Sequence, residues 1–241
     1  MSSTTSTTVT ELRARLLDWW GRSSRVFPWR KTRDPYRVLL AEALLHRTRA
    51  DQVVDLYERT LQAYPTVEKL ATADRGALHK LLHSAGLRWR VDRLAEAAKH
   101  IVERFAGEIP RNRADLESIP GVGHYIAAAV QCFAFGAPEA IIDSNVVRVY
   151  SRVFDIPVTD RLRRDQHFHR LAQSLIDPEH PREFNLALLD LAAAICTPQK
   201  PKCEQCPIVG CCAFGHRVLG LNPPPSVLPR TQAGVPVPPA E

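Results

Sequence analysis

Apolar residues recur along most of this chain with the three- to four-residue spacing of one helix face. Leu12, Leu16, Trp19 and Trp20 form one such stripe after Thr10. Similar stripes predict helices over 36–45, 51–63, 67–71, 75–84, 88–105, 145–154, 165–176 and 183–195. The two-residue alternation of a half-buried β-strand is almost absent. The pattern therefore predicts an all-α fold.

Two further predicted helices are joined by a very short turn. The first helix ends near Ser118, the turn IPGVG covers 119–123, and the second helix begins at about His124. Because proline and glycine do not continue a helix, the segment 115–136 is predicted to be a helix-hairpin-helix. Its glycines allow close backbone approach to a phosphate, and the N–H groups that open the second helix form an anion site.

The composition favours a polyanionic partner, because 32 Lys and Arg stand against 26 Asp and Glu, a net charge of +6. A mildly basic enzyme with a solvated surface would have the same balance. The N-terminal residues MSSTTSTTVT lack the apolar core of a signal peptide, and no apolar run of about 18 residues predicts a membrane span. We therefore expect a cytoplasmic protein in which the 6 Cys are ligands or buried thiols.

Asp143 follows the apolar run 140–142 and precedes the predicted helix 145–154. An Asp before a helix is most often an N-cap, and a Gly-Val-Gly segment between helices is most often only a turn. Together, however, LxxIPGVGxx, a helix and (I/V)DxNVxRV resemble the helix-hairpin-helix-GPD superfamily of DNA base-excision glycosylases. In that superfamily the Asp is catalytic, so the resemblance implies a nucleoid-associated enzyme with Asp143 in its active site.

The predicted helix 36–45 is apolar on nearly every side except at Glu42. A buried carboxylate is costly unless it is paired or functional, and in an arbitrary helix a salt bridge to Arg37 or Arg47 would be the simpler explanation. The stretch DPYRVLLAEALLHRT resembles the segment of MutY-type and mismatch-specific thymine glycosylases that carries a pocket Glu. The resemblance places Glu42 in the base pocket and brings Arg47 and Thr48 into the minor groove. Arg47 agrees with the thymine branch, since MutY-type enzymes usually have Gln there.

Tyr125 stands where lyase-competent relatives carry a Lys that forms a Schiff base with the sugar. A phenol cannot form an imine, so a monofunctional glycosylase is expected. MutY-type adenine glycosylases usually have Ser at this position and a further C-terminal domain, which the Pro-rich stretch after Cys212 does not resemble. Tyr125 with AExLLxRT upstream is similar to the thymine-DNA glycosylases that process G·T and G·U mismatches.

Four cysteines near the C-terminus have the spacing C-x6-C-x2-C-x5-C. They are Cys196, Cys203, Cys206 and Cys212. Zinc is the general expectation for four Cys, but structural zinc sites commonly pair two short knuckles and only one is present here. The spacing, with FNLALLDLAAAICT upstream, resembles the four-iron four-sulfur loop of the endonuclease III and MutY branches. The resemblance implies a 4Fe-4S cluster whose loop carries Lys200 and Lys202 toward phosphates.

These features predict a monofunctional glycosylase of base excision repair that hydrolyses the N-glycosidic bond of a flipped T or U opposite G, and acts on double-stranded DNA as a monomer. Asp143, Glu42 and Tyr125 are the expected catalytic residues. The expected DNA contacts are Arg47, Thr48, Gly121, Val122, Gly123, His124, Lys200 and Lys202. Three alternatives stay open: a MutY-like adenine glycosylase acting on A opposite G or 8-oxoguanine without the C-terminal recognition domain, a glycosylase for another modified base, and a non-catalytic DNA-binding protein.

The resemblance also implies two helical domains with a DNA cleft between them. Residues 34–136 would form a six-helix domain that ends in the hairpin. Residues 10–33 and 137–212 would form the second domain, including the iron-sulfur loop 196–212.

The two ends are expected to be tails: residues 1–9 are rich in Ser and Thr and predicted to be flexible, and the Pro-rich residues 213–241 are predicted to be disordered. The Arg-rich loop 21–35, in which we expect Arg25 to be exposed, fits a solvated loop and a DNA-facing rim equally well.

Overall fold

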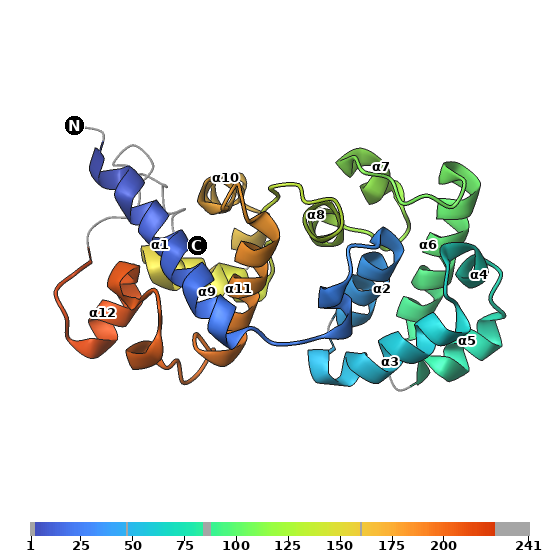
Figure 1. Cartoon of the computed structure of the whole chain (residues 1–241), viewed down its shortest axis with the longest axis horizontal. Helices are drawn as coiled ribbons and strands as arrows, with labels where there is room; N and C mark the ends of the chain where they lie inside the picture. Colours follow the sequence, from blue (N-terminus) through green and yellow to red (C-terminus); the bar gives the residue numbers. More distant parts are fainter. Residues whose placement is uncertain (1–2, 47, 84–87, 160, 225–241) are drawn as a thin grey trace. The chain divides into compact units, whose positions relative to one another are not determined.

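The structure, a computed structural model, describes residues 3–46, 48–83, 88–159 and 161–224. Within these residues every regular element is a helix, which confirms the all-α prediction (Figure 1). The chain divides into a central unit, Val26–Glu139, and a terminal unit that combines Met1–Arg25 with Ala140–Glu241. The domain boundaries expected from the sequence stay predictions. No helix in the described ranges is long and apolar enough to cross a membrane.

The helices of the central unit begin mostly at polar caps. Its elements are η1 (Pro28–Lys31), α2 (Pro35–Leu45), α3 (Ala50–Ala63), α4 (Val67–Ala71), α5 (Arg75–Leu81), α6 (Arg88–Phe105), α7 (Arg113–Ser118) and α8 (His124–Phe133). Side chains of Asp34, Thr66, Asp74 and Asn112 accept hydrogen bonds from the first turns of α2, α4, α5 and α7. The apolar helix α2 packs against α3 and α8, and α6 packs against α4 and α5 (Figure 1).

The terminal unit joins the first helix to the last part of the chain. Its elements are α1 (Ser3–Ser23), α9 (Ser144–Phe154), η3 (Leu162–Arg164), α10 (Gln166–Leu175), α11 (Pro181–Ala194), η4 (Cys203–Gln205), η5 (Val209–Cys211) and α12 (Ala213–Leu219). Helix α11 packs against α1 and α9, and α9 also packs against α12. Leu12 and Leu16 of the predicted stripe lie in the core beside Tyr150 and Phe184.

Two ends of the chain contain more helix than the sequence predicted. Helix α1 begins at Ser3 instead of Thr10, and α12 forms at Ala213–Leu219, inside the segment predicted to be disordered. The prediction treated the whole of 213–241 as disordered because of its prolines. Helix α12 precedes those prolines, begins at the Cys212 cap and ends at Gly220, whose φ of +66° suits a helix C-terminus.

A buried carboxylate holds the end of α1 against α11. Asp190 is 1% exposed, and its Oδ1 accepts from Arg25 Nε at 2.5 Å. Its Oδ2 accepts from Trp20 Nε1 at 3.0 Å and from the Arg25 N–H at 3.1 Å. The Arg25 side chain is 38% exposed, so the expected exposure is found in part, but its guanidinium is paired with a buried carboxylate. Its partner Asp190 lies 165 residues away in the sequence, so no local pattern indicates the pair.

We expect Asp190→Ala to lower the free energy of unfolding by about 2 to 3 kcal/mol, because it leaves the Trp20 and Arg25 donors without their buried acceptor. The measurement is urea denaturation followed by circular dichroism. Asp18→Ala is the matched control, since it removes the exposed Asp18–Arg22 pair, and should cost less than about 0.5 kcal/mol. Equal costs for the two variants would contradict the structural role of Asp190.

Candidate active site

Asp143 lies at the N-terminus of α9, where its half-buried carboxylate caps the helix. Its Oδ1 accepts hydrogen bonds from the N–H groups of Asn145 and Val146, each at 2.8 Å. Its Oδ2 accepts one from Asn145 Nδ2 at 2.6 Å. These bonds satisfy amides that have no acceptor within the helix and hold the carboxylate in one orientation. Capping and catalysis are compatible, because a carboxylate has about four acceptor sites and these bonds use three.

Arg148 connects this carboxylate to the start of the cysteine loop. Its Nη2 donates to Asn145 Oδ1 at 3.1 Å and to Ala192 O at 3.0 Å, and its Nε donates to Cys196 O at 2.9 Å. Burial lowers the pKa of Arg148, and this shift is opposed by Cys196 and Asp143 nearby. The orientation of Asp143 and the path of the cysteine loop therefore depend on the same arginine.

Glu42 and Tyr125 both lie in the central unit, on α2 and α8, which pack against each other. Glu42 is 5% exposed and has the buried residues Leu39 and Leu40 as neighbours along its helix. Tyr125 is half-buried in the first turn of α8. These two predicted residues thus belong to neighbouring helices of one unit, whereas Asp143 belongs to the terminal unit.

The predicted hairpin is formed by α7, the turn 119–123 and α8. Val122 is buried, and its N–H donates to Ile119 O at 3.0 Å, so its side chain and its N–H are both used within the hairpin. Gly121 has a φ of +84°, a conformation that other residues rarely adopt. Gly123 caps α8 without a side chain, and no described atom lies within 4 Å of the position that a Cβ there would take. The space beside Gly123 at the start of α8 is therefore open, and an anion site at this helix N-terminus requires such space.

Charged side chains beside the hairpin form a network. Arg113 Nη2 lies 2.6 Å from Glu139 Oε2, and Arg113 Nη1 lies 3.6 Å from Glu117 Oε1. The same Glu117 oxygen lies 3.0 Å from His124 Nδ1. The predicted DNA contact His124 is exposed, but its ring already has a carboxylate and the Arg113 guanidinium as neighbours.

Arg90 holds the turn that follows α2. Its Nη1 donates to Leu44 O at 3.0 Å and to Thr48 Oγ1 at 2.8 Å, and its Nη2 donates to His46 O. Arg90 is 5% exposed, so its role is to position this turn rather than to bind a ligand directly. The predicted contact Thr48 lies in the held turn, and Arg47 lies outside the described residues. The apolar stripe that predicts a helix over 88–105 gives no signal that Arg90 points inward.

The four predicted cysteine ligands lie on the segment that follows α11. Cys203 begins η4, Cys206 follows it as its C-cap, and Cys212 caps α12 by accepting from the Gly215 N–H at 3.4 Å. Burial raises the pKa of Cys206 to about 12 and that of Cys212 to about 11, and the other thiols of the set raise both. The four sulfur atoms therefore lie within electrostatic range of one another. In the described residues, no three His, Cys, Asp or Glu side chains are arranged to hold a metal ion.

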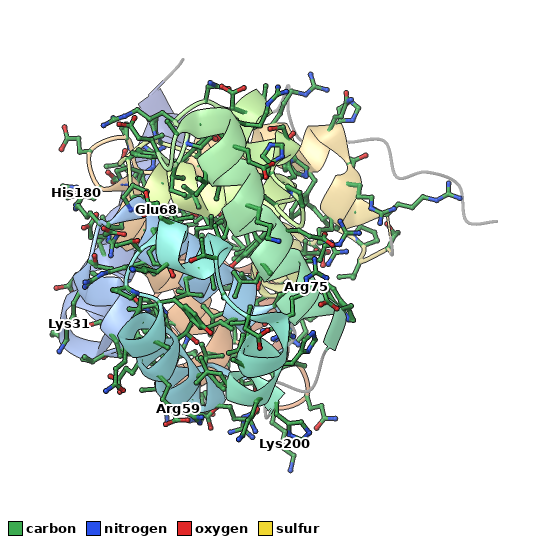
Figure 2. All side chains as sticks on the ribbon, turned by 90° about the vertical axis from the view of Figure 1, so that its right-hand side faces the viewer. Lys31, Arg59, Glu68, Arg75, His180 and Lys200 are labelled. Carbon is green, nitrogen blue, oxygen red and sulfur yellow. The ribbon has the colours of Figure 1, made fainter. Side chains whose placement is uncertain are left out.

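Arg152 supports the same loop from α9. Its Nη1 donates to Thr197 O at 2.7 Å and to Cys196 Sγ at 3.3 Å, and its Nη2 donates to Pro198 O at 2.7 Å. The exposed Lys200 extends away from the ribbon at the tip of the loop (Figure 2). Lys202 is also exposed. Both predicted lysine contacts are therefore available to an anionic partner.

The sequence and the fold match known proteins over most of the chain. The family described as "HhH-GPD superfamily base excision DNA repair protein" matches residues 40–176. A thymine/uracil-DNA glycosylase from Methanothermobacter thermautotrophicus is 38% identical over 200 residues, which cover 83% of this chain and 90% of that protein. The solved structure of a thermostable thymine-DNA glycosylase is similar with a TM-score of 0.83 and 35% identity, over 88% of this chain and 99% of that one.

An adenine DNA glycosylase from Rattus norvegicus is similar as well. It is 37% identical over 222 residues, which cover 87% of this chain and 43% of that protein. Similarity to both kinds of glycosylase agrees with the resemblance drawn from the hairpin and Asp143.

We expect Gly121→Ala to lower the free energy of unfolding by about 2 kcal/mol, because the left-handed conformation disfavours a Cβ and this Cβ would lie 3.3 Å from Arg93 Cβ. Thermal and urea denaturation measure the effect. Gly123→Ala in the same turn is the control: its backbone is extended and its surroundings are open, so only the weaker capping preference of Ala opposes it. A Gly121 variant as stable as the Gly123 variant would contradict this account of the turn.

Proposed function

Because the chain belongs to the HhH-GPD superfamily of base excision DNA repair proteins, we propose that this DNA glycosylase removes thymine or uracil opposite guanine from double-stranded DNA. The observation that carries the proposal is the 38% identity to a thymine/uracil-DNA glycosylase over 83% of this chain. The presence of Tyr125 at the second position of α8 supports the same specificity, since the resemblance drawn from the sequence assigns Tyr to the thymine branch.

Hydrolysis of the N-glycosidic bond requires stabilisation of the positive charge that grows on the deoxyribose as the base leaves. A fixed carboxylate beside the sugar provides this, and the hydrogen bonds from Asn145 and Val146 fix that of Asp143. Water then bonds to the C1′ carbon, and its proton passes to Asp143 or to solvent. The bonding electrons leave with the base, and Glu42 is the group we propose to protonate or orient it.

We propose further that the enzyme is monofunctional. A lyase step requires an amine that forms an imine with C1′ after the base has left. Tyr125 presents a phenol at the position that resembles the lyase lysine, and a phenol forms no imine. The expected product is therefore an abasic site in an unbroken strand.

The DNA backbone would bind at the hairpin, where the open N–H groups at the start of α8 suit a phosphate. The turn held by Arg90 and the exposed Lys200 and Lys202 would add further contacts. In the proposed architecture each of the two units contributes DNA contacts, and the protein acts as a monomer.

A 4Fe-4S cluster fits the donor set of the cysteine loop. Such a cluster takes four Cys thiolates, one for each iron, so its ligands stand farther apart than those of a single ion. Cys196, Cys203, Cys206 and Cys212 would hold it, with Arg152 and the Gly215 N–H as hydrogen-bond donors to sulfur. Burial opposes thiolate formation at Cys206 and Cys212, and a bound cluster would supply the compensating positive charge. Its proposed contribution is structural, because it would fix the loop that Arg148 and Arg152 contact.

A second candidate function is adenine removal opposite guanine or 8-oxoguanine. The 37% identity to the rat adenine DNA glycosylase favours it. The two candidates share the hairpin and Asp143 but differ in the base that the pocket accepts, so a substrate panel separates them.

The test is single-turnover base release from end-labelled duplexes that contain T·G, U·G, A·G or A·8-oxoguanine, with and without alkali. We expect release at T·G and U·G, and strand scission only after alkali. Release of adenine alone would support the second candidate, and scission without alkali would refute the monofunctional mechanism.

Asp143→Asn and Asp165→Asn form a matched pair for the same assay. Both residues are helix N-caps, and Asn caps as well as Asp, so both variants should fold. We expect Asp143→Asn to lower the rate of release at least about 100-fold, because the fixed charge is lost, and Asp165→Asn to leave it unchanged. An active Asp143→Asn enzyme would favour a non-catalytic role for this carboxylate.

The cluster proposal predicts four iron and four sulfide per chain in protein purified without oxygen, with broad visible absorbance. Cys203→Ser should lose most of the iron, because it removes a ligand. Cys211→Ser should keep it, although Cys211 lies buried in the same loop. Zinc in place of iron, or full iron retention in Cys203→Ser, would contradict the assignment.

A further inference from the structure

The hairpin offers N–H groups to a phosphate, but the ionic side chains around it do not favour an anion. Arg113 is the cation of the network, and the two carboxylates Glu117 and Glu139 lie within 3.6 Å and 2.6 Å of it. His124 adds a positive charge only when protonated. When His124 is neutral, one cation against two carboxylates leaves this group with a negative balance. A cation from another element would therefore strengthen the binding of a phosphate at the hairpin.

Arg93 on α6 supplies such a cation in the central unit. Its Cβ, Cγ and Cδ lie 3.3, 3.8 and 3.9 Å from the position that a Cβ on Gly121 would take. The aliphatic part of the side chain thus lies across the turn, and the guanidinium begins one bond beyond Cδ. The absence of a side chain at Gly121 is what leaves room for this contact, in addition to the positive φ that the turn requires.

The Arg93 side chain is exposed and available. Within the described ranges no ion pair or hydrogen bond involves its guanidinium, in contrast to Arg113 and Arg90. A guanidinium also matches two oxygens of one phosphate at once.

We propose that Arg93 binds the DNA phosphodiester that the hairpin amides of Gly123 and α8 contact, and so provides the charge that this clamp otherwise lacks. The inference rests on the proposed DNA-binding role of the hairpin. It assigns the clamp to three segments: the turn, the start of α8 and the second turn of α6. Arg90 and Arg93 would then connect one helix to both DNA-facing loops, since Arg90 positions the turn after α2 and Arg93 contacts the phosphate.

The test is fluorescence anisotropy of the full-length chain with a labelled duplex that carries a tetrahydrofuran abasic site opposite guanine, between about 50 and 200 mM salt. We expect Arg93→Ala to bind about fivefold to tenfold more weakly near 0.1 M salt and to reduce the slope of log K against log salt by about one. Arg93→Lys should keep the slope, because it keeps the charge, with an affinity between the two. An unchanged slope in Arg93→Ala would overturn the proposal.

Arg104→Ala is the matched control. Arg104 is an exposed arginine on the same helix, also without an ion pair to a described residue, and lies roughly 16 Å farther along it. That distance exceeds the Debye length of about 10 Å at 0.1 M salt, so removal of its charge should leave affinity and slope unchanged. An equal effect of both variants would indicate a general loss of charge and would also overturn the proposal. Circular dichroism melts establish that each variant is folded.

Base release from T·G by the wild-type chain, measured in parallel, separates this inference from the proposed function. No release together with an Arg93-dependent salt slope would refute the thymine specificity and retain the phosphate contact. Release together with an unchanged slope would refute the contact and retain the specificity.

Discussion

The hydrogen bonds between the Asp143 carboxylate and the first turn of α9 are the constraint on which the proposed chemistry depends. A carboxylate that stabilises a growing positive charge must already be held in the correct orientation. Two backbone N–H groups and one side-chain amide hold the Asp143 carboxylate in this way. The same bonds start the helix, so the fold maintains the orientation at no separate cost. The same hydrogen bonds thus serve both the capping role of Asp143 and its proposed functional role.

From this cap the network continues through Asn145 to Arg148, and from Arg148 to the carbonyl groups of Ala192 and Cys196. Arg152, one turn further along α9, holds the carbonyl groups of Thr197 and Pro198. Partly buried guanidinium groups need hydrogen-bond acceptors. The carbonyl groups of an irregular loop can fill this role, because they are not used in helical hydrogen bonds. The cysteine loop thus stabilises the helix that Asp143 caps, which is a physical reason to keep the loop in one conformation.

Local patterns predicted most of the helices, the hairpin turn and the position of the cap, because each of these depends on residues close together in the sequence. They did not predict the Asp190–Arg25 pair, the inward direction of Arg90 or the contact of Arg93 with Gly121. Each of these joins segments that are distant in sequence. The local sequence pattern around a single arginine in a helix is the same whether its side chain faces water or a carbonyl group. Helix α12 was missed for another reason. The prediction treated 213–241 as one Pro-rich segment, but its prolines all follow the helix.

The net charge of +6 favours a polyanion, yet the structure shows that many arginines are neutralised locally. Arg15, Arg22 and Arg59 pair with carboxylates four residues earlier on their own helices, and Arg59 lies at the surface in this role (Figure 2). Such pairs contribute little to long-range attraction, because each is close to a neutral dipole. Arginines with buried partners, such as Arg25 and Arg90, hold the fold. Recognition of a phosphate backbone therefore depends on the cations that remain, and their positions matter more than the total charge.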